Sequence, residues 1–133
     1  TGHLVLATLH TNDAASAITR LTDMGVEPFL LSSSLLGVLA QRLVRKYCGH
    51  CHGGDHGAGC EHCGHTGYAG RTGVFELLVV DDAIRAQIHG QAAEADVRAQ
   101  ALAGGMTLMR DDGERLIAAG ITSREEVLRV TRD

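Results

Sequence analysis

Four cysteines constrain this chain more than any other feature of its sequence. All of them lie in one short window, in the pattern Cys48-x2-Cys51-x8-Cys60-x2-Cys63. Two residues between paired cysteines let both sulfurs approach one ion, and two such pairs supply a closed tetrahedral all-sulfur site. The pattern therefore predicts a bound metal; zinc is favoured, and four thiolates also suit iron. Because four protein ligands leave no open position, the metal would be structural rather than catalytic.

The residues around the cysteines form a loop module without a hydrophobic core. Residues 49–73 hold nine of the 17 glycines and five of the eight histidines of the chain. A metal ion would take the place of the missing core. A histidine could replace a cysteine as ligand, but the thiolate set is complete without one, so we expect solvated loop residues. These histidines are His50, His52, His56, His62 and His65.

Composition narrows the class of protein. Hydrophobic residues make up 44% of the 133 residues, with no Trp, two Phe and two Tyr, so the core must be aliphatic. The net charge of −4 argues against a nucleic-acid binder. No apolar run approaches the roughly 20 residues of a membrane span, and no signal peptide is visible. The clustering of the cysteines disfavours a disulfide framework and indicates a reducing, cytosolic compartment.

The first 80 residues predict strands and helices in alternation. Residues 3–9 are apolar on both faces, which is typical of a central strand in a parallel α/β sheet. Since this run opens the chain, we expect further residues upstream of it. Asn12 or Asp13 can cap a helix over 14–24, and Pro28 can open another helical turn. Strands are expected over 35–40, 43–48 and 73–80, with a polar break at Gln41–Arg42; a helix over 35–48 is the alternative.

Helices are expected in the remainder of the chain, over 82–89, 94–102, 108–119 and 123–131. Asp81 can cap the first of them, and the last begins with two capping signals, Thr122 with Glu125 and Ser123 with Glu126. The acidic pairs Asp81–Asp82 and Asp111–Asp112 lie at helix starts or on a polar helix face. We therefore interpret these pairs as structural charges rather than as a metal or acid–base site.

Three sets of motifs resemble a known family. They are TGHLVLATLHTN at the start, the paired CxxC motifs, and GYAGRTGVFELLVV with GITSREEVLRVT later in the chain. Together they resemble the C-terminal portion of the secretion ATPases. This family includes the type II secretion system ATPase, general secretion pathway protein E, and the type IV pilus assembly ATPases. The first motif is similar to the family's His box, and the CxxC pair marks the secretion and pilus-extension branch rather than the retraction branch.

The resemblance implies an α/β fold, namely the C-terminal part of a P-loop RecA-like ATPase core with an inserted four-cysteine zinc module and an all-helical C-terminal subdomain. The core with its His box would span 1–47, the metal excursion 48–66, the return strand 67–80 and the helical subdomain 81–133. The sequence contains nothing similar to the Walker A, Asp box or Walker B segments. We expect these segments upstream, and we expect this chain alone to be inactive.

The resemblance also implies the function of the full-length protein. It would be a homohexameric ATPase that uses ATP and Mg to power protein export by the type II secretion system. It would be cytoplasmic and peripheral at the inner membrane, held there by secretion-system components, without spanning the membrane itself. A type IV pilus assembly ATPase is the alternative within the family, and a stand-alone zinc-binding adaptor module is the alternative from another class.

His10 is the candidate catalytic residue. In parallel α/β sheets, ligands bind beyond the carboxyl ends of the strands. His10 would lie at such an end, with Thr11 and Asn12 beside it, and the resemblance implies that it senses the γ-phosphate of ATP. His3 would lie at the opposite end of the same strand, so we expect a structural or subunit contact there.

Three arginines flank the metal loop: Arg42, Arg45 and Arg71. A contact with nucleotide or with a neighbouring subunit is conceivable for them. A solvated side chain is the ordinary state of a surface arginine, and we expect it for Arg45.

Overall fold

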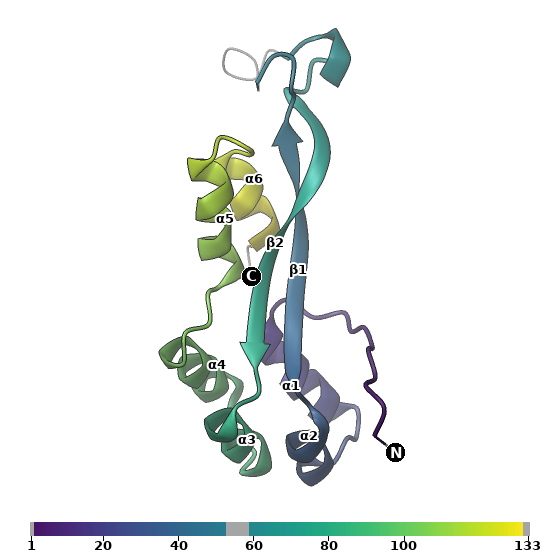
Figure 1. Cartoon of the computed structure of the whole chain (residues 1–133), viewed down its shortest axis with the longest axis vertical. Coiled ribbons are helices and arrows are strands. Elements are labelled where there is room, and N and C mark those ends of the chain that lie inside the picture. The colour runs from purple at the N-terminus through teal and green to yellow at the C-terminus, as the bar shows by residue number, and fades with distance from the viewer. Residues whose placement is uncertain (1, 53–58, 132–133) are drawn as a thin grey trace. The chain divides into compact units, whose positions relative to one another are not determined.

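The computed structural model describes residues 2–52 and 59–131 (Figure 1). The chain divides into two compact units. One comprises Thr1–Val38 and Leu78–Gly105, and the other comprises Leu39–Leu77 and Met106–Asp133. No helix in the described part of the chain is long and apolar enough to cross a membrane.

The described residues of the first unit form four helices: α1 (Ala14–Asp23), α2 (Pro28–Ser34), α3 (Asp82–His89) and α4 (Glu94–Ala103). Helix α2 packs against α3, α1 packs against α4, and α3 packs against α4. These elements confirm the predicted helices to within one or two residues. Small and aliphatic side chains form their buried faces, namely Ala14, Ala15, Ala17, Ile18, Leu31, Ile84, Ile88, Val97 and Ala101.

Aspartates begin two of these helices. The Asp13 carboxylate accepts a hydrogen bond from the Ser16 N–H at 2.8 Å and caps α1, while its other oxygen pairs with Arg98 of α4 at 2.7 Å. Burial by itself raises the pKa of Asp13, but the hydrogen bonds from Ser16 and Arg98 outweigh it and lower that pKa. Asp81 caps α3 by accepting from the Ile84 N–H at 2.9 Å. The structural interpretation of Asp81 is therefore confirmed.

The strand predicted over residues 3–9 is not formed. Residues 2–11 lie in no helix or strand. The side chains of Leu4, Val5 and Leu6 are 75%, 77% and 89% exposed. A strand is held by hydrogen bonds to a neighbour, and its apolar faces need covering layers. No described strand pairs with this run, so apolar composition alone does not produce the strand.

The second unit contains most of a two-stranded sheet, β1 (Gly37–Tyr47) and β2 (Tyr68–Val79). The strands run antiparallel (Figure 1). The parallel sheet was predicted for the strand at residues 3–9, which is not formed. The predicted break at Gln41–Arg42 is wrong, because β1 is continuous through both residues. Strand β2 also begins five residues before the predicted Gly73. Hydrogen bonding between the two backbones extends the strands through polar and glycine-rich stretches. An apolar sequence pattern does not predict strand structure in such stretches.

Helices α5 (Met109–Ala118) and α6 (Arg124–Thr131) pack beside this ribbon. Their core with the strands consists of Val44, Val74, Met109, Leu116 and Val127, with Ala40, Ile117, Ile121 and Val130 packed against it. Gly113 lets the two helices approach closely, since a Cβ atom there would lie 2.4 Å from a methyl carbon of Val127.

The predicted helices after residue 81 are all present, but they do not form one subdomain. Helices α3 and α4 belong to the first compact unit, and α5 and α6 belong to the second. The helical subdomain expected over residues 81–133 is therefore divided between the two compact units.

Candidate metal centre

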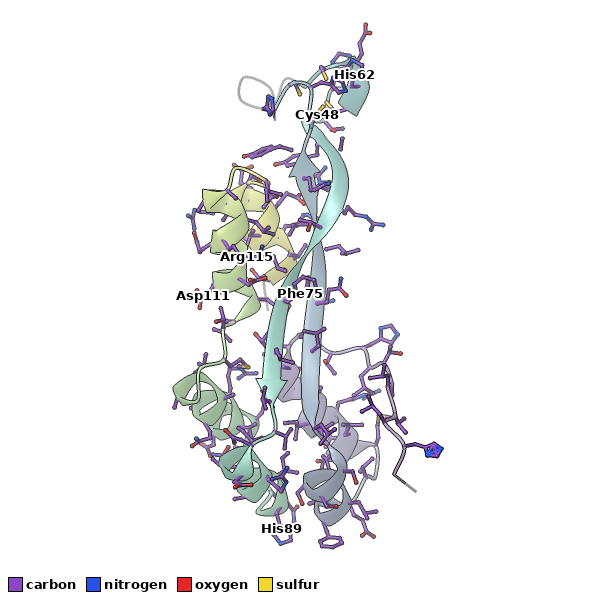
Figure 2. All side chains as sticks on the ribbon, viewed as in Figure 1. Cys48, His62, Phe75, His89, Asp111 and Arg115 are labelled. Atoms are coloured by element: carbon purple, nitrogen blue, oxygen red, sulfur yellow. The ribbon has the colours of Figure 1, made fainter. Side chains whose placement is uncertain are left out.

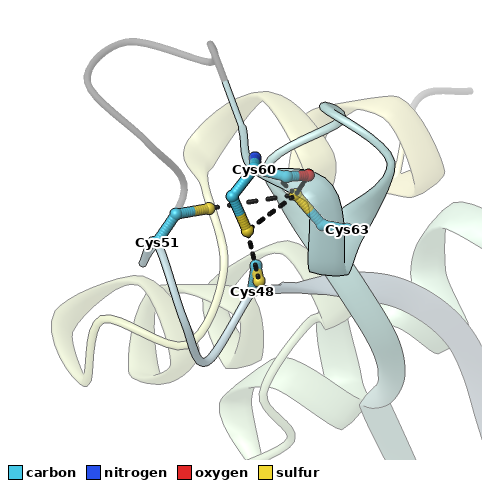
Figure 3. Close-up of side chains that lie close together, drawn as sticks. All are labelled: Cys48, Cys51, Cys60 and Cys63. Atoms are coloured by element: carbon cyan, nitrogen blue, oxygen red, sulfur yellow. Dashed lines mark hydrogen bonds between the residues drawn. The ribbon is translucent and has the colours of Figure 1, made fainter.

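The first cysteine pair directly follows β1. Cys48 is buried, and its sulfur accepts a hydrogen bond from the His50 N–H at 3.4 Å. The chain then turns back, because the His52 N–H donates to the Cys48 carbonyl at 2.7 Å while His52 has a φ of +51°. This tight turn brings Cys51 to the same side as Cys48 (Figure 3).

The second pair is built on a short 3-10 turn, η2 (Glu61–Cys63). The Cys63 sulfur accepts hydrogen bonds from the N–H groups of Cys60 and Gly67, both at 3.2 Å. The His65 N–H closes the turn on the Cys60 carbonyl at 2.8 Å. Gly59 packs against this turn so closely that a Cβ atom would lie 2.4 Å from the His65 carbonyl carbon. The glycines of this segment thus permit the close approach of backbone that the turn requires.

The four sulfurs converge on one point. The sulfur of Cys60 lies 3.7 Å from that of Cys48 and 3.9 Å from that of Cys63, and the sulfurs of Cys51 and Cys63 are 3.9 Å apart. All four lie within 4.8 Å of one another (Figure 3). A zinc–sulfur bond of about 2.3 Å in a tetrahedron gives sulfur–sulfur distances of about 3.8 Å. The predicted ligands are therefore brought together at the spacing that a tetrahedral metal requires.

The backbone around Cys48 and Cys63 favours the thiolate form of these two residues. Hydrogen bonds from the N–H groups of Cys60 and Gly67 lower the pKa of Cys63 to about 6, against an opposing effect of desolvation. The N–H groups of Cys51 and His50 likewise lower the pKa of Cys48. Since a thiolate is the form that binds metal, this donor set fits a zinc ion.

The histidines of the module that the structure describes are not part of the ligand cluster. His50 and His62 occupy the same place in the two CxxC pairs, and their rings stack with centroids 3.7 Å apart and planes 14° apart. Figure 2 shows His62 and Cys48 in the segment that connects β1 to β2. His52 and His65 are exposed turn residues with positive φ, and His56 lies outside the described residues. The ligand cluster among the described residues consists of cysteines.

His10, Thr11 and Asn12 lie together immediately before α1. The Thr11 hydroxyl donates to the Asp13 carbonyl at 3.1 Å, so this segment is tied to the residue that caps the helix. The side chains of His10 and His3 are exposed. No strand ends at His10 in this structure, and its role at a phosphate stays a prediction.

The expectation of a solvated Arg45 is confirmed only in part: its side chain is 46% exposed, but it also makes specific contacts. Its guanidinium pairs with Glu126 at 2.7 Å and lies over the Tyr68 ring, 4.4 Å from the centroid. Glu126 was interpreted as the capping partner of Ser123. The Ser123 hydroxyl does accept from the Glu126 N–H at 3.1 Å, but the carboxylate turns to Arg45 and Arg129 instead. Because Arg45 and Glu126 are 81 positions apart, local spacing carries no signal for this contact.

Comparison with known proteins identifies the family to which this chain belongs. Residues 1–129 match the family described as Type II/IV secretion system protein. The chain is 65% identical over 137 aligned residues to "Type II secretion system protein HxcR" of Pseudomonas aeruginosa, covering 100% of this chain and 29% of that protein. It is 49% identical to "Type II secretion system ATPase E" of Vibrio cholerae, covering 100% of this chain and 30% of that protein.

Pilus motors are also similar to the chain. "Type IV pilus assembly ATPase PilB" of Thermus thermophilus is 48% identical over 96% of this chain and 17% of its own length. The crystal structure of the pilus retraction motor PilT with bound ADP superposes with a TM-score of 0.71 at 27% identity, covering 100% of this chain and 34% of that one. These matches support the α/β class. The chain spans about 30% of the length of its secretion relatives, and the matches do not confirm the expected C-terminal position within them.

Proposed function

The chain belongs to the type II/IV secretion system protein family, and from this premise we propose that it is part of an ATPase that powers protein export by a type II secretion system. The observation that carries the proposal is the family match over residues 1–129, together with 65% identity to a type II secretion protein. The full-length protein would use ATP with Mg. It would act as a homohexamer in the cytoplasm, peripheral at the inner membrane through secretion-system components.

Two alternatives are weaker. A type IV pilus assembly ATPase is supported by the 48% identity to a pilus assembly relative, which is lower than the identity to the secretion protein. A stand-alone zinc-binding adaptor would share the cysteine module, but it would not account for family similarity that extends from residue 1 to residue 129.

The four cysteines would hold one structural zinc ion in this protein. Three sulfur–sulfur distances of 3.7–3.9 Å, the approach of all four sulfurs to within 4.8 Å of one another, and the lowered pKa values of Cys48 and Cys63 support this assignment. A bound zinc would supply the folding energy that the glycine-rich module lacks, and four thiolates would leave it no position for substrate.

His10 would sense the γ-phosphate in the full-length protein. The neighbouring residue Thr11 is hydrogen-bonded to Asp13, which caps α1. This contact supports the idea that a movement of the His10 side chain can alter the position of α1. A neutral imidazole can donate one hydrogen bond to a phosphate oxygen, and that bond is lost when the phosphate leaves.

Deletion of the parent gene in its host tests the proposed function. Exported enzymes should accumulate inside the cell while surface pili remain normal, and the full-length gene should restore export. Loss of pili with normal export would instead support the pilus assembly alternative. Normal export together with normal pili would contradict both motor assignments.

A further inference from the structure

Two tyrosines bracket the four-cysteine module. Tyr47 ends β1 directly before Cys48, and Tyr68 begins β2 directly after Gly67. Their rings stack with centroids 5.6 Å apart and planes 10° apart. The module ties the same two segments together, since the Cys48 N–H donates to the Gly67 carbonyl at 2.9 Å and the Gly67 N–H donates to the Cys63 sulfur at 3.2 Å. The stacking of the tyrosines therefore depends on how the cysteine pairs close.

The tyrosine pair also holds the residues that lead into α6. The hydroxyl oxygens of Tyr68 and Ser123 are 2.7 Å apart. The Tyr47 N–H donates to the Ile121 carbonyl at 2.7 Å. Ser123 in turn accepts from the Glu126 N–H in the first turn of α6. The two tyrosines thus adjoin the cysteine module in the sequence and contact the residues at the start of α6.

Arg45 and Glu126 form a second connection between the tyrosine pair and α6. The Arg45 guanidinium lies over Tyr68, and its Nε and Nη2 atoms donate to the Glu126 carboxylate at 3.0 and 2.7 Å. The Arg45 N–H donates to the same carboxylate at 2.9 Å, and the Arg45 carbonyl accepts from the Thr122 hydroxyl at 2.6 Å. Glu126 is only 2% exposed. A cation–π contact therefore connects the aromatic pair to a buried carboxylate on α6.

We propose that metal binding at the four cysteines and docking of α6 are thermodynamically coupled, with Tyr68 and Arg45 transmitting the coupling. The inference rests on the metal site proposed above. A bound metal holds the ends of β1 and β2 together, which keeps Tyr68 where Ser123 and Arg45 reach it. Without the metal, the same contacts form only at the entropic cost of ordering both segments. By reciprocity, docking of α6 raises the metal affinity by the same factor.

Hydrogen exchange measured by mass spectrometry on the 133-residue chain tests the coupling. The zinc content of each sample is measured in parallel by elemental analysis. Removing zinc with a chelator should lower the protection of α6 by about tenfold, within the usual range of coupling between sites. Protection of α4, in the first unit, is the internal control and should not change. The chain has two Tyr and no Trp, so tyrosine fluorescence reports on this pair alone and should change together with α6.

The variant Tyr68→Leu decides whether the tyrosine carries the coupling. It should still bind one zinc, but the protection of α6 should no longer depend on zinc. Tyr68→Phe is the milder companion, because it keeps the stacked ring and loses only the contact with Ser123. It should lose part of the zinc dependence even where the leucine variant fails to fold.

The outcomes separate the coupling from the metal site. Wild-type chain that binds zinc but keeps the same α6 protection after zinc removal would overturn the coupling and leave the metal site intact. Wild-type chain that binds no zinc would overturn both. Full zinc dependence in both Tyr68 variants would overturn the proposed route.

Discussion

Replacing Glu126 by Gln should destabilise the second unit by about 3 kcal/mol at neutral pH. The carboxylate is 2% exposed and accepts hydrogen bonds from Arg45 and Arg129. Burial by itself raises the pKa of Glu126, but the hydrogen bonds from Arg129 and Arg45 outweigh it and lower that pKa from 4.5 to about 2. At about 1.4 kcal/mol for each unit of pKa, this difference corresponds to about 3 kcal/mol. Gln keeps the shape of the side chain and loses the charge.

This stabilisation depends on pH. Because the pKa of Glu126 is lower in the folded state than its ordinary value of 4.5, the full contribution is present above about pH 4.5. It is lost as the pH falls toward the folded-state pKa of about 2, where the carboxylate becomes protonated in both states. The stabilities of the wild type and Glu126→Gln should therefore converge at the acid end of this range.

Urea denaturation followed by circular dichroism, from neutral pH down to about pH 2, measures both effects. Glu114→Gln is the matched control, since Glu114 of α5 pairs with Arg124 of α6 but both side chains are exposed. An exposed pair contributes little, so this variant should resemble the wild type. A Glu126→Gln chain as stable as the wild type at neutral pH would refute the reasoning, and so would a deficit that stays constant as the pH falls.

Four further predictions concern the metal, the chemistry and the packing. Freshly reduced chain should carry one zinc per polypeptide by elemental analysis, and Cys60→Ser should lose it; less than half an equivalent of any metal in the wild type would contradict the site. The 133-residue chain should not hydrolyse ATP in a phosphate-release assay, because its sequence contains no P-loop to hold the phosphates. In the full-length parent, His10→Ala should lower kcat roughly 100-fold with little change in ATP affinity, whereas His3→Ala should affect assembly more than turnover. The opposite pattern would reverse the two assignments. Gly113→Ala should destabilise the second unit by about 1–3 kcal/mol in urea denaturation, because its methyl group would overlap Val127.

Helix caps and cysteine turns could be predicted from the sequence, because the residues that form each of them lie within a few positions of one another. Asp81 lies directly before its helix and was predicted as the cap from spacing alone, whereas Asp13 was one of two candidates with Asn12. The two cysteine pairs likewise depend on residues that are close in the sequence. Each CxxC turn is closed by hydrogen bonds between neighbouring residues, and the ligand set was predicted without knowledge of the fold.

Tertiary structure decided whatever depends on distant partners. The apolar run at residues 3–9 predicts a buried strand. A strand forms only where another backbone pairs with it, and none of the described strands pairs with this run. The polar residues Gln41 and Arg42 look like a break, yet pairing with β2 carries β1 through them. Arg45 is half-exposed, as expected of a surface charge, but its pairing with Glu126, 81 positions away, and its contact with Tyr68 depend on the fold. The sequence thus determined its helix starts and the two cysteine turns, because these are short-range chemistry. The packing of the chain decided the strands and the pairing of the buried Glu126 carboxylate with half-exposed arginines, because hydrogen-bond partners and desolvation are properties of the assembled fold.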